Sequence, residues 1–197
     1  MSTDRTRGTQ WRVFCAFELP ESLRVRIKEH AERVREAVPD VAASWSQPEN
    51  IHLTMKFFGS VDQAKAPAIS DVLTRVAKEF SPVKIVVGGM GVFPRPSRPQ
   101  VLWIGIDDHT GALAKLQKRV EDECAREGFP KEDRAFRPHL TIARIRNPHN
   151  ANRLAEAHLH TEFTAIELVL NELVLFRSEL SPKGSKYTPI SRSWLES

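Results

Sequence analysis

One tripeptide occurs twice in this sequence, and its residue types are suited to proton transfer. His-Leu-Thr stands at residues 52–54 and again at 139–141, a separation of 139 − 52 = 87 residues in a chain of 197. Imidazole exchanges protons near neutral pH because its ordinary pKa is about 6.5. A threonine hydroxyl can donate a hydrogen bond to a phosphoryl oxygen without adding charge. The two motifs therefore indicate acid and base catalysis at phosphorus.

Strand geometry would place each histidine beside its threonine. Side chains at positions i and i+2 of a strand share a face, so His52 and Thr54 point the same way, as do His139 and Thr141. In-line displacement needs a base at the attacking water and an acid at the leaving oxygen, each within about 2.6–3.2 Å of its oxygen. We therefore predict that the two imidazoles face each other across a cleft, with ring nitrogens roughly 6–9 Å apart.

Basic residues near both motifs are candidate phosphate ligands. Lys56 and Arg137 share the strand parity of the nearest histidine. Arg144 has the opposite parity, so it reaches the phosphate only if its strand ends, bulges or twists near Ala143. The alternative for each of these three side chains is a solvated surface charge.

Three further residues are candidates for contacts with parts of a ligand beyond its phosphate. Phe58 shares the predicted face of His52 and is a candidate for stacking on a base, although a plain packing role is the alternative. Residues 88–100 are rich in Gly and Pro, and we expect no regular structure along their length. Arg95 and Arg98 lie in this connection, where they are candidates for contacts with a polyanionic ligand.

The other chemically interesting side chains show no pattern of a site. We expect the remaining histidines, which are His30, His109, His149, His158 and His160, to lie at the surface. None of them has standard metal-ligand spacing, so no metal or cofactor is predicted. Cys15 stands in an apolar run and is expected to be a buried, inert thiol.

The elements that must position the two motifs follow the same order twice. Hydrophobic periodicity predicts strands at 12–19, 51–58, 83–87, 101–106 and 137–145, one or two strands in 163–176, and helices at 21–38, 63–80, 110–128 and 150–159. The tail, 177–190, is predicted to form a hairpin that turns at 181–184. A duplicated, bilobal α+β domain with a pseudo-twofold axis is the simplest account, and a chance tripeptide match is the alternative.

The overall composition fits a soluble domain. Hydrophobic residues make up 41% of the 197 residues, and the formal net charge is 29 − 25 = +4. This small surplus is compatible with a polyanionic partner. We expect one domain over 1–197, a flexible leader at residues 1–11, a cytoplasmic location, no membrane contact and no obligate protein partner.

The ordered set of motifs resembles the two-histidine (2H) phosphoesterase superfamily, and most closely its RNA 2′,3′-cyclic phosphodiesterase branch, also called 2′-5′ RNA ligase. The resemblance covers residues 11–194. The segments that carry it are RVFCAFELP (12–20), PENIHLTMKFFG (48–59), GVFPRPSRPQVLW (91–103), FRPHLTIAR (136–144) and FRSELSPKGSKYTPI (176–190).

This resemblance implies antiparallel sheets that line a central cleft, with helices packed outside. It also implies metal-independent hydrolysis of RNA 2′,3′-cyclic phosphate ends, such as those of tRNA fragments, to 2′-phosphomonoesters. His52 would be the proton donor and His139 the proton acceptor, while Thr54 and Thr141 would hold phosphoryl oxygens. Some members of the family also join RNA ends through a 2′-5′ bond in vitro.

Other functions are compatible with the same motifs. One alternative is a related enzyme that takes a small nucleotide cyclic phosphate, an ADP-ribose cyclic phosphate or a 2′-5′ oligoadenylate. A nucleotide-binding module without turnover is an alternative from another class, although binding alone needs no matched acid and base. A metal-dependent hydrolase is a poor alternative because few carboxylates lie near either motif.

Overall fold

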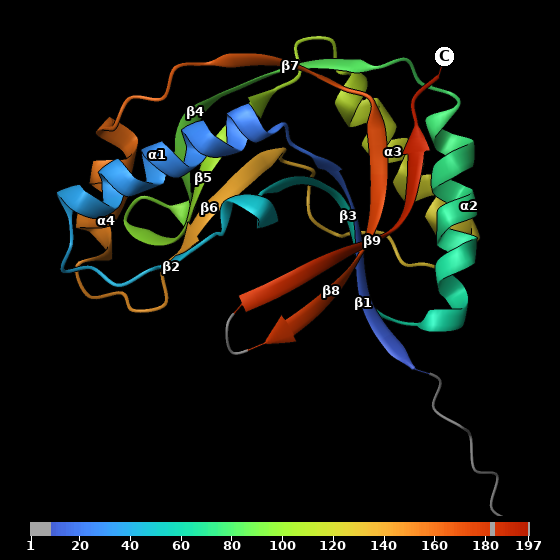
Figure 1. The fold of residues 1–197 in the computed structure, drawn as a ribbon, viewed down its shortest axis with the longest axis horizontal. Helices are drawn as coiled ribbons and strands as arrows, with labels where there is room; N and C mark the ends of the chain where they lie inside the picture. The colour runs from blue at the N-terminus through green and yellow to red at the C-terminus, as the bar shows by residue number, and fades with distance from the viewer. Residues whose placement is uncertain (1–8, 182–183, 197) are drawn as a thin grey trace, which may run out of the picture.

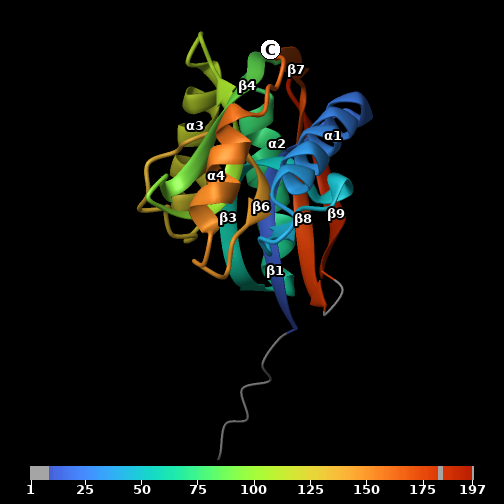
Figure 2. The same ribbon diagram turned by 90° about the vertical axis from the view of Figure 1, so that its left-hand side faces the viewer.

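The chain forms two antiparallel sheets and two pairs of helices (Figure 1). The computed structural model describes residues 9–181 and 184–196. The first sheet has the strand order β3-β1-β8-β9, and the second has the order β2-β6-β5-β4-β7. Helix α1 packs beside α4, and α2 packs beside α3, as two views at right angles show (Figures 1 and 2).

The elements alternate along the chain largely as predicted. The strands are β1 (Gln10–Glu18), β2 (Ser44–Trp45), β3 (His52–Asp62), β4 (Val83–Arg95), β5 (Arg98–Asp107), β6 (His139–Arg144), β7 (Ile166–Leu170), β8 (Glu172–Ser181) and β9 (Gly184–Trp194). The α-helices are α1 (Glu21–Ala37), α2 (Ala66–Ala77), α3 (Ala112–Arg126) and α4 (Ala151–His160). Among these described elements, no helix is long and apolar enough to cross a membrane.

The strand pairing reflects the duplication. β1 pairs with β3 in the first sheet, and β5 pairs with β6 in the second. β8, which follows the second motif, joins the first sheet beside β1, whereas β4, which follows the first motif, joins the second sheet beside β5. Each sheet therefore takes its third strand from the other copy. The predicted α+β class with antiparallel sheets is confirmed.

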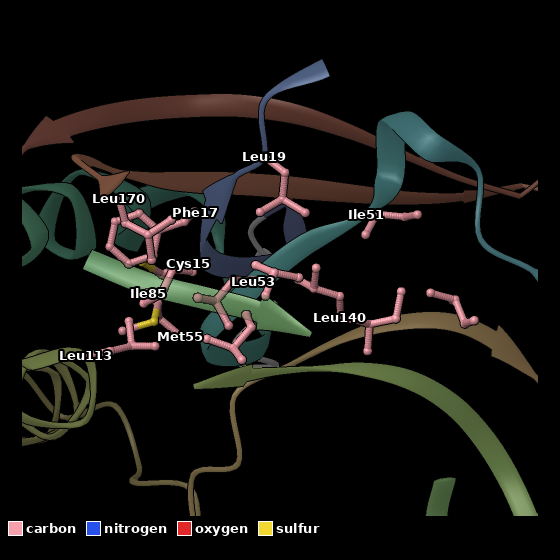
Figure 3. Packing of buried hydrophobic residues seen from close by; sticks show 14 of the residues in the cluster. Cys15, Phe17, Leu19, Ile51, Leu53, Met55, Ile85, Leu113, Leu140 and Leu170 are labelled. Atoms are coloured by element: carbon pink, nitrogen blue, oxygen red, sulfur yellow. The ribbon is translucent and has the colours of Figure 1, made fainter. Parts of the chain in front are cut away.

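The residue between each histidine and threonine anchors its strand in one common core. Leu53 and Leu140 are fully buried and belong to the same hydrophobic cluster, which Figure 3 shows at close range. Burying a leucine stabilises the fold by about 1.5–3 kcal/mol. Since alternate side chains of a strand point to opposite faces, this burial turns both His-x-Thr pairs away from the core.

A β-bulge follows the threonine of each motif. The register of β3 against β1 shifts at Met55, and the register of β6 against β5 shifts at Ile142, with 142 − 55 = 87 residues between the two positions. Each bulge leaves two consecutive residues buried, at 55–56 and at 142–143. Because a bulge inserts one unpaired residue, side chains beyond it point to the faces opposite to those that simple alternation predicts.

Our expectation that residues 88–100 lack regular structure is wrong. β4 runs on to Arg95 and β5 begins at Arg98, so the segment belongs to a hairpin. Glycine inside this strand makes room for a neighbour: a Cβ atom at Gly91 would lie 2.0 Å from Cζ2 of Trp103.

The prediction for the C-terminal tail is confirmed, whereas the prediction of a flexible leader does not hold for its last two residues. The predicted tail hairpin is confirmed, since β8 pairs with β9, although positions 182–183 of its expected turn lie outside the described residues. Positions 1–8 of the expected flexible leader also lie outside them, and its last residues, Gln10 and Trp11, are in β1.

Candidate active site

Both motifs line a single cavity of about 500 Å³, a volume typical of sites for small molecules. Its walls come from β1, β3, β6, β8 and β9 and from the segment before β3. Six of the lining residues matter most for the chemistry, and they are His52, Thr54, His139, Thr141, Arg12 and Arg144. Among the described residues no Asp or Glu lines the cavity, and the two arginines favour an anionic ligand.

The backbone holds the two imidazoles in equivalent ways. Nδ1 of His52 donates to the carbonyl oxygen of Asn50 at 2.8 Å, and Nδ1 of His139 donates to that of Arg137 at 2.7 Å. A carbonyl oxygen can only accept, so Nδ1 carries the proton in both rings. Nε2 is therefore the nitrogen that is left free on each ring to take or give a proton in the cavity.

Aromatic side chains pack against both rings and partly bury them. The ring of His52 stacks on Phe14 at 4.6 Å and meets Tyr187 edge-on at 5.2 Å. Phe93 contacts His139 edge-on at 5.0 Å. Burial lowers the pKa of His52 to about 4, and burial also lowers the pKa of His139. Both imidazoles are thus neutral at pH 7 in the free protein.

The two threonines lie where the motifs predicted them, on the cavity side of their strands. The segment before β3 contacts the second motif: the hydroxyl of Ser46 donates to the carbonyl oxygen of Thr141 at 2.9 Å, and the Ser46 amide donates to that of Ile142. These hydrogen bonds connect the segment that precedes the first motif with β6, the strand of the second motif.

The predicted placement of Lys56 on the cavity face is wrong. Lys56 is buried, and its Nζ lies 2.6 Å from Oε2 of Glu121 and 2.8 Å from the carbonyl oxygen of Pro130. The bulge at Met55 is the cause, because it inverts the alternation on which the prediction was based.

Phe58 was also predicted on the wrong face. Its ring contacts Phe129 edge-on at 5.5 Å, which agrees with the packing alternative. Phe57, which simple alternation from Leu53 would place in the core, lines the cavity instead and is 42% exposed. The same bulge at Met55 accounts for this exchange.

The four candidate arginines are placed differently. Arg144 lines the cavity, because the bulge at Ile142 restores it to the face of Thr141. Arg137 is exposed and contributes its carbonyl oxygen to His139. Arg95 and Arg98 face each other at the exposed end of the β4–β5 hairpin, outside the lining of the cavity.

Two other histidines are buried, although we expected both at the surface. Nε2 of His30 on α1 lies 3.0 Å from Nδ1 of His158 on α4, and Nε2 of His158 lies 3.0 Å from the carbonyl oxygen of Trp103. That carbonyl must accept, so His158 is protonated at Nε2, and His30 donates to its Nδ1. A further proton on His158 would break this chain.

We predict that acidification destabilises the protein between about pH 6.5 and pH 4. Burial lowers the pKa of His30 and of His52 to about 4, and it also lowers the pKa of His158. The unfolded chain therefore binds more protons than the folded protein in this range. A shift of one pKa unit is worth about 1.4 kcal/mol, so His30 alone should contribute about 3 kcal/mol of this loss by pH 4. Urea unfolding at stepwise pH measures this loss.

The His30→Leu variant should lose less stability on acidification than the natural protein. The matched control is His109→Ala, which removes a histidine whose side chain is 73% exposed. It should change the pH dependence far less than His30→Leu does. An unfolding free energy that stays constant from pH 7 to pH 4 would contradict the buried, neutral pair.

Several lining residues carried no signal in the sequence. Asn50 connects two walls, since its carbonyl oxygen accepts from His52 and its side-chain amide donates to the carbonyl oxygen of Ser185 at 2.8 Å. Tyr187, on the same strand as Ser185, contacts the ring of His52. For His30, by contrast, the sequence contains a signal of burial. His30 follows Ile27 by three residues and precedes Val34 by four, which places it on the buried face of α1.

The described residues offer no arrangement suited to a metal ion. Within positions 9–181 and 184–196, no group of three or more His, Cys, Asp or Glu side chains stands close enough to hold one. Cys15 and Cys124 are free and buried, as predicted for Cys15, and burial raises the pKa of both thiols.

Residues 19–182 match the family model of the 2′-5′ RNA ligase superfamily. The chain belongs to this superfamily. The RNA 2′,3′-cyclic phosphodiesterase of Methanothermobacter thermautotrophicus is 35% identical over 182 residues, covering 90% of this chain and 95% of the relative. The protein of the same name from Aquifex aeolicus is 34% identical over 188 residues, covering 93% and 97%.

Two crystal structures share the fold of this chain. The crystal structure of TT0787 of Thermus thermophilus superposes with a TM-score of 0.76 at 25% identity, covering 93% of this chain and 97% of that one. The crystal structure of E. coli LigT complexed with 3′-AMP gives a TM-score of 0.73 at 24% identity, covering 96% and 100%. The match to the family model confirms the superfamily resemblance expected from the motifs.

Proposed function

We propose that this protein hydrolyses 2′,3′-cyclic phosphate ends of RNA to 2′-phosphomonoesters, with His52 and His139 as acid and base and without a metal ion. The observation that carries the proposal is the equivalent arrangement of the two rings. Each has its Nδ1 fixed on a backbone carbonyl, and both line one cavity together with Thr54 and Thr141. The names of the curated relatives support RNA cyclic phosphate as the substrate.

The proposed reaction transfers two protons. Nε2 of His139 accepts a proton from water as the water oxygen bonds to phosphorus, and the bond from phosphorus to the 3′ oxygen breaks. Nε2 of His52 gives its proton to that leaving oxygen, so that the 2′-phosphomonoester remains. Thr54, Thr141 and Arg144 hold the phosphoryl oxygens and stabilise the developing charge. The same attack on phosphorus by a 5′ hydroxyl in place of water, with the 3′ oxygen again leaving, would form a 2′-5′ bond.

The donor role of His52 requires substrate. In the free protein its pKa is lowered to about 4, which by itself would suit a base better than an acid. A bound cyclic phosphate brings a negative charge next to Nε2, and an adjacent opposite charge favours the protonated imidazole. We therefore place the charging of His52 in the complex, where the acid is needed.

The test is to incubate the protein with an oligonucleotide that ends in a 2′,3′-cyclic phosphate, in excess chelator, and to identify the product. We expect complete hydrolysis to the 2′-phosphomonoester. A 3′-phosphomonoester would overturn the assignment of the leaving oxygen, and loss of activity in chelator would overturn the metal-free mechanism.

Further arms of this experiment separate the alternatives. An enzyme for small nucleotides would hydrolyse 2′,3′-cyclic mononucleotides or 2′-5′ oligoadenylate in preference to the oligonucleotide. It would also be insensitive to the double change Arg95→Ala and Arg98→Ala, whereas we expect this change to weaken binding of the oligonucleotide. Binding without any turnover would identify a nucleotide-binding module.

A further inference from the structure

Because each strand has a bulge, the two motifs are followed by the same order of buried and exposed residues. The last position of this order holds a different residue type in each strand. From the histidine onward, both strands run through a buried leucine, a cavity-facing threonine, two consecutive buried residues and then an exposed residue. That last position is Phe57 in β3 and Arg144 in β6, and 144 − 57 = 87 residues separate them. Bulges often stand next to active sites, where they re-aim a side chain. Here the same device turns Arg144 and Phe57 toward the cavity.

The burial of Lys56 and the exposure of Phe57 are unfavourable for the stability of the fold. To expose a phenylalanine here, the strand buries Lys56, a residue type that is almost never fully buried unless it is paired. Simple alternation would place the lysine outside and the phenylalanine inside, which is the cheaper choice. Departures of this kind concentrate at functional sites.

Phe57 continues the aromatic wall that begins at His52. Phe14 stacks on His52 at 4.6 Å, and Phe57 is the cross-strand partner of Phe14. Residues directly opposite in an antiparallel pair have Cβ atoms about 4.5–5.5 Å apart. Phe57 thus neighbours Phe14 across the strand pair and lines the same cavity as His52, where a nucleotide whose phosphate lies at His52 can meet its ring.

A guanidinium completes the surface. The Cζ atom of Arg12 lies 4.7 Å from the ring centroid of Phe57, and both side chains line the cavity. Aromatic rings and guanidinium planes are the surfaces on which unpaired bases stack. No carboxylate lines the cavity among the described residues, so nothing there repels the polyanionic backbone.

We propose that Phe57 and Arg12 form a stacking platform for a nucleobase of the substrate, and that the bulge at Met55 places this platform beside the catalytic cavity. This inference rests on the proposed function and deepens it. The platform gives the site an affinity for nucleotides that is independent of base identity, since every base has a face on which to stack.

The test compares two substrates across matched variants. One is an oligonucleotide with a 2′,3′-cyclic phosphate end, and the other is glycerol 1,2-cyclic phosphate, which has the same kind of five-membered ring but no base. We expect Phe57→Ala to raise KM for the oligonucleotide about 5- to 100-fold with kcat retained. Hydrolysis of the base-free substrate should not change.

Two controls make the result specific. Phe57→Trp should retain a low KM for the oligonucleotide because the indole also stacks. Val25→Ala removes an apolar side chain of similar exposure, 45%, on α1, and it should leave both substrates unaffected. An unchanged KM in Phe57→Ala would overturn the platform, and so would an equal loss on the two substrates.

A binding measurement keeps this test separate from the proposed activity. A cyclic-phosphate oligonucleotide with 2-aminopurine in its last positions should lose fluorescence on binding the natural protein, because stacking quenches the base. Phe57→Ala should abolish that quenching, and equal quenching by both proteins would overturn the platform. If the natural protein hydrolyses neither substrate, the proposed function fails, and this measurement still decides the platform.

Discussion

His52→Ala and His139→Ala should each lower kcat for cyclic phosphate hydrolysis by at least about 10²-fold, because one proton transfer typically contributes about 10²–10⁴ in rate. Both rings offer a free Nε2 to the same cavity, and no other histidine lines it among the described residues. No other imidazole among these lining residues is therefore placed to take over either role. Steady-state rates on the cyclic-phosphate oligonucleotide measure the effect.

The loss must be separated from misfolding, since His52 also stacks on Phe14. Circular dichroism and urea unfolding of each variant provide that separation. His149→Ala, which changes an exposed histidine, serves as the control and should retain full activity. If a folded His52→Ala or His139→Ala variant retained activity within tenfold of the natural protein, the assignment of that histidine would be wrong.

Lys56→Met should lower the free energy of unfolding by about 3–5 kcal/mol, because it leaves the Glu121 carboxylate buried without its partner. Lys56 and Glu121 are both buried, with Nζ and Oε2 2.6 Å apart. The same pair holds the segment before β6, since Lys56 donates to Pro130 and the amide of Glu132 donates to Glu121. Urea unfolding at pH 7 measures the change.

Two controls define what this loss means. Lys118→Ala removes one partner of a solvent-exposed ion pair with Asp122 and should cost no more than about 1 kcal/mol. The double change Lys56→Met and Glu121→Leu leaves no buried charge, so it should recover part of the stability lost by Lys56→Met alone. Unchanged stability in Lys56→Met would show that the pair has no structural role.

The sequence was sufficient to predict what depends on simple periodicity. Simple alternation puts Leu53 and Leu140 on the face opposite to the histidines and threonines, and the burial of both leucines turns the two motifs toward one cavity. The α+β class and the tail hairpin follow from the same kind of pattern. Amphipathic alternation determines these features because burial of apolar side chains dominates folding.

The errors have local physical causes that periodicity cannot detect. A bulge adds one residue to a strand without changing its composition, so the faces of Lys56, Phe57 and Phe58 could not be deduced from alternation. Gly91 suggested a loop, yet it lies in a strand. The strand carries a glycine there because Trp103 occupies the space that a larger side chain would need. His30 could have been placed correctly, because its spacing with Val34 marks the buried side of α1.

The joint action of His52 and His139 on one phosphorus is tested most directly by the rate of the double variant His52→Ala and His139→Ala. Groups that act as a unit in one step give strongly non-additive losses. We therefore expect the double variant to hydrolyse the cyclic-phosphate oligonucleotide at a rate within about tenfold of the slower single variant. Losses that multiply in full would show that the two imidazoles act independently, which would contradict a shared reaction centre.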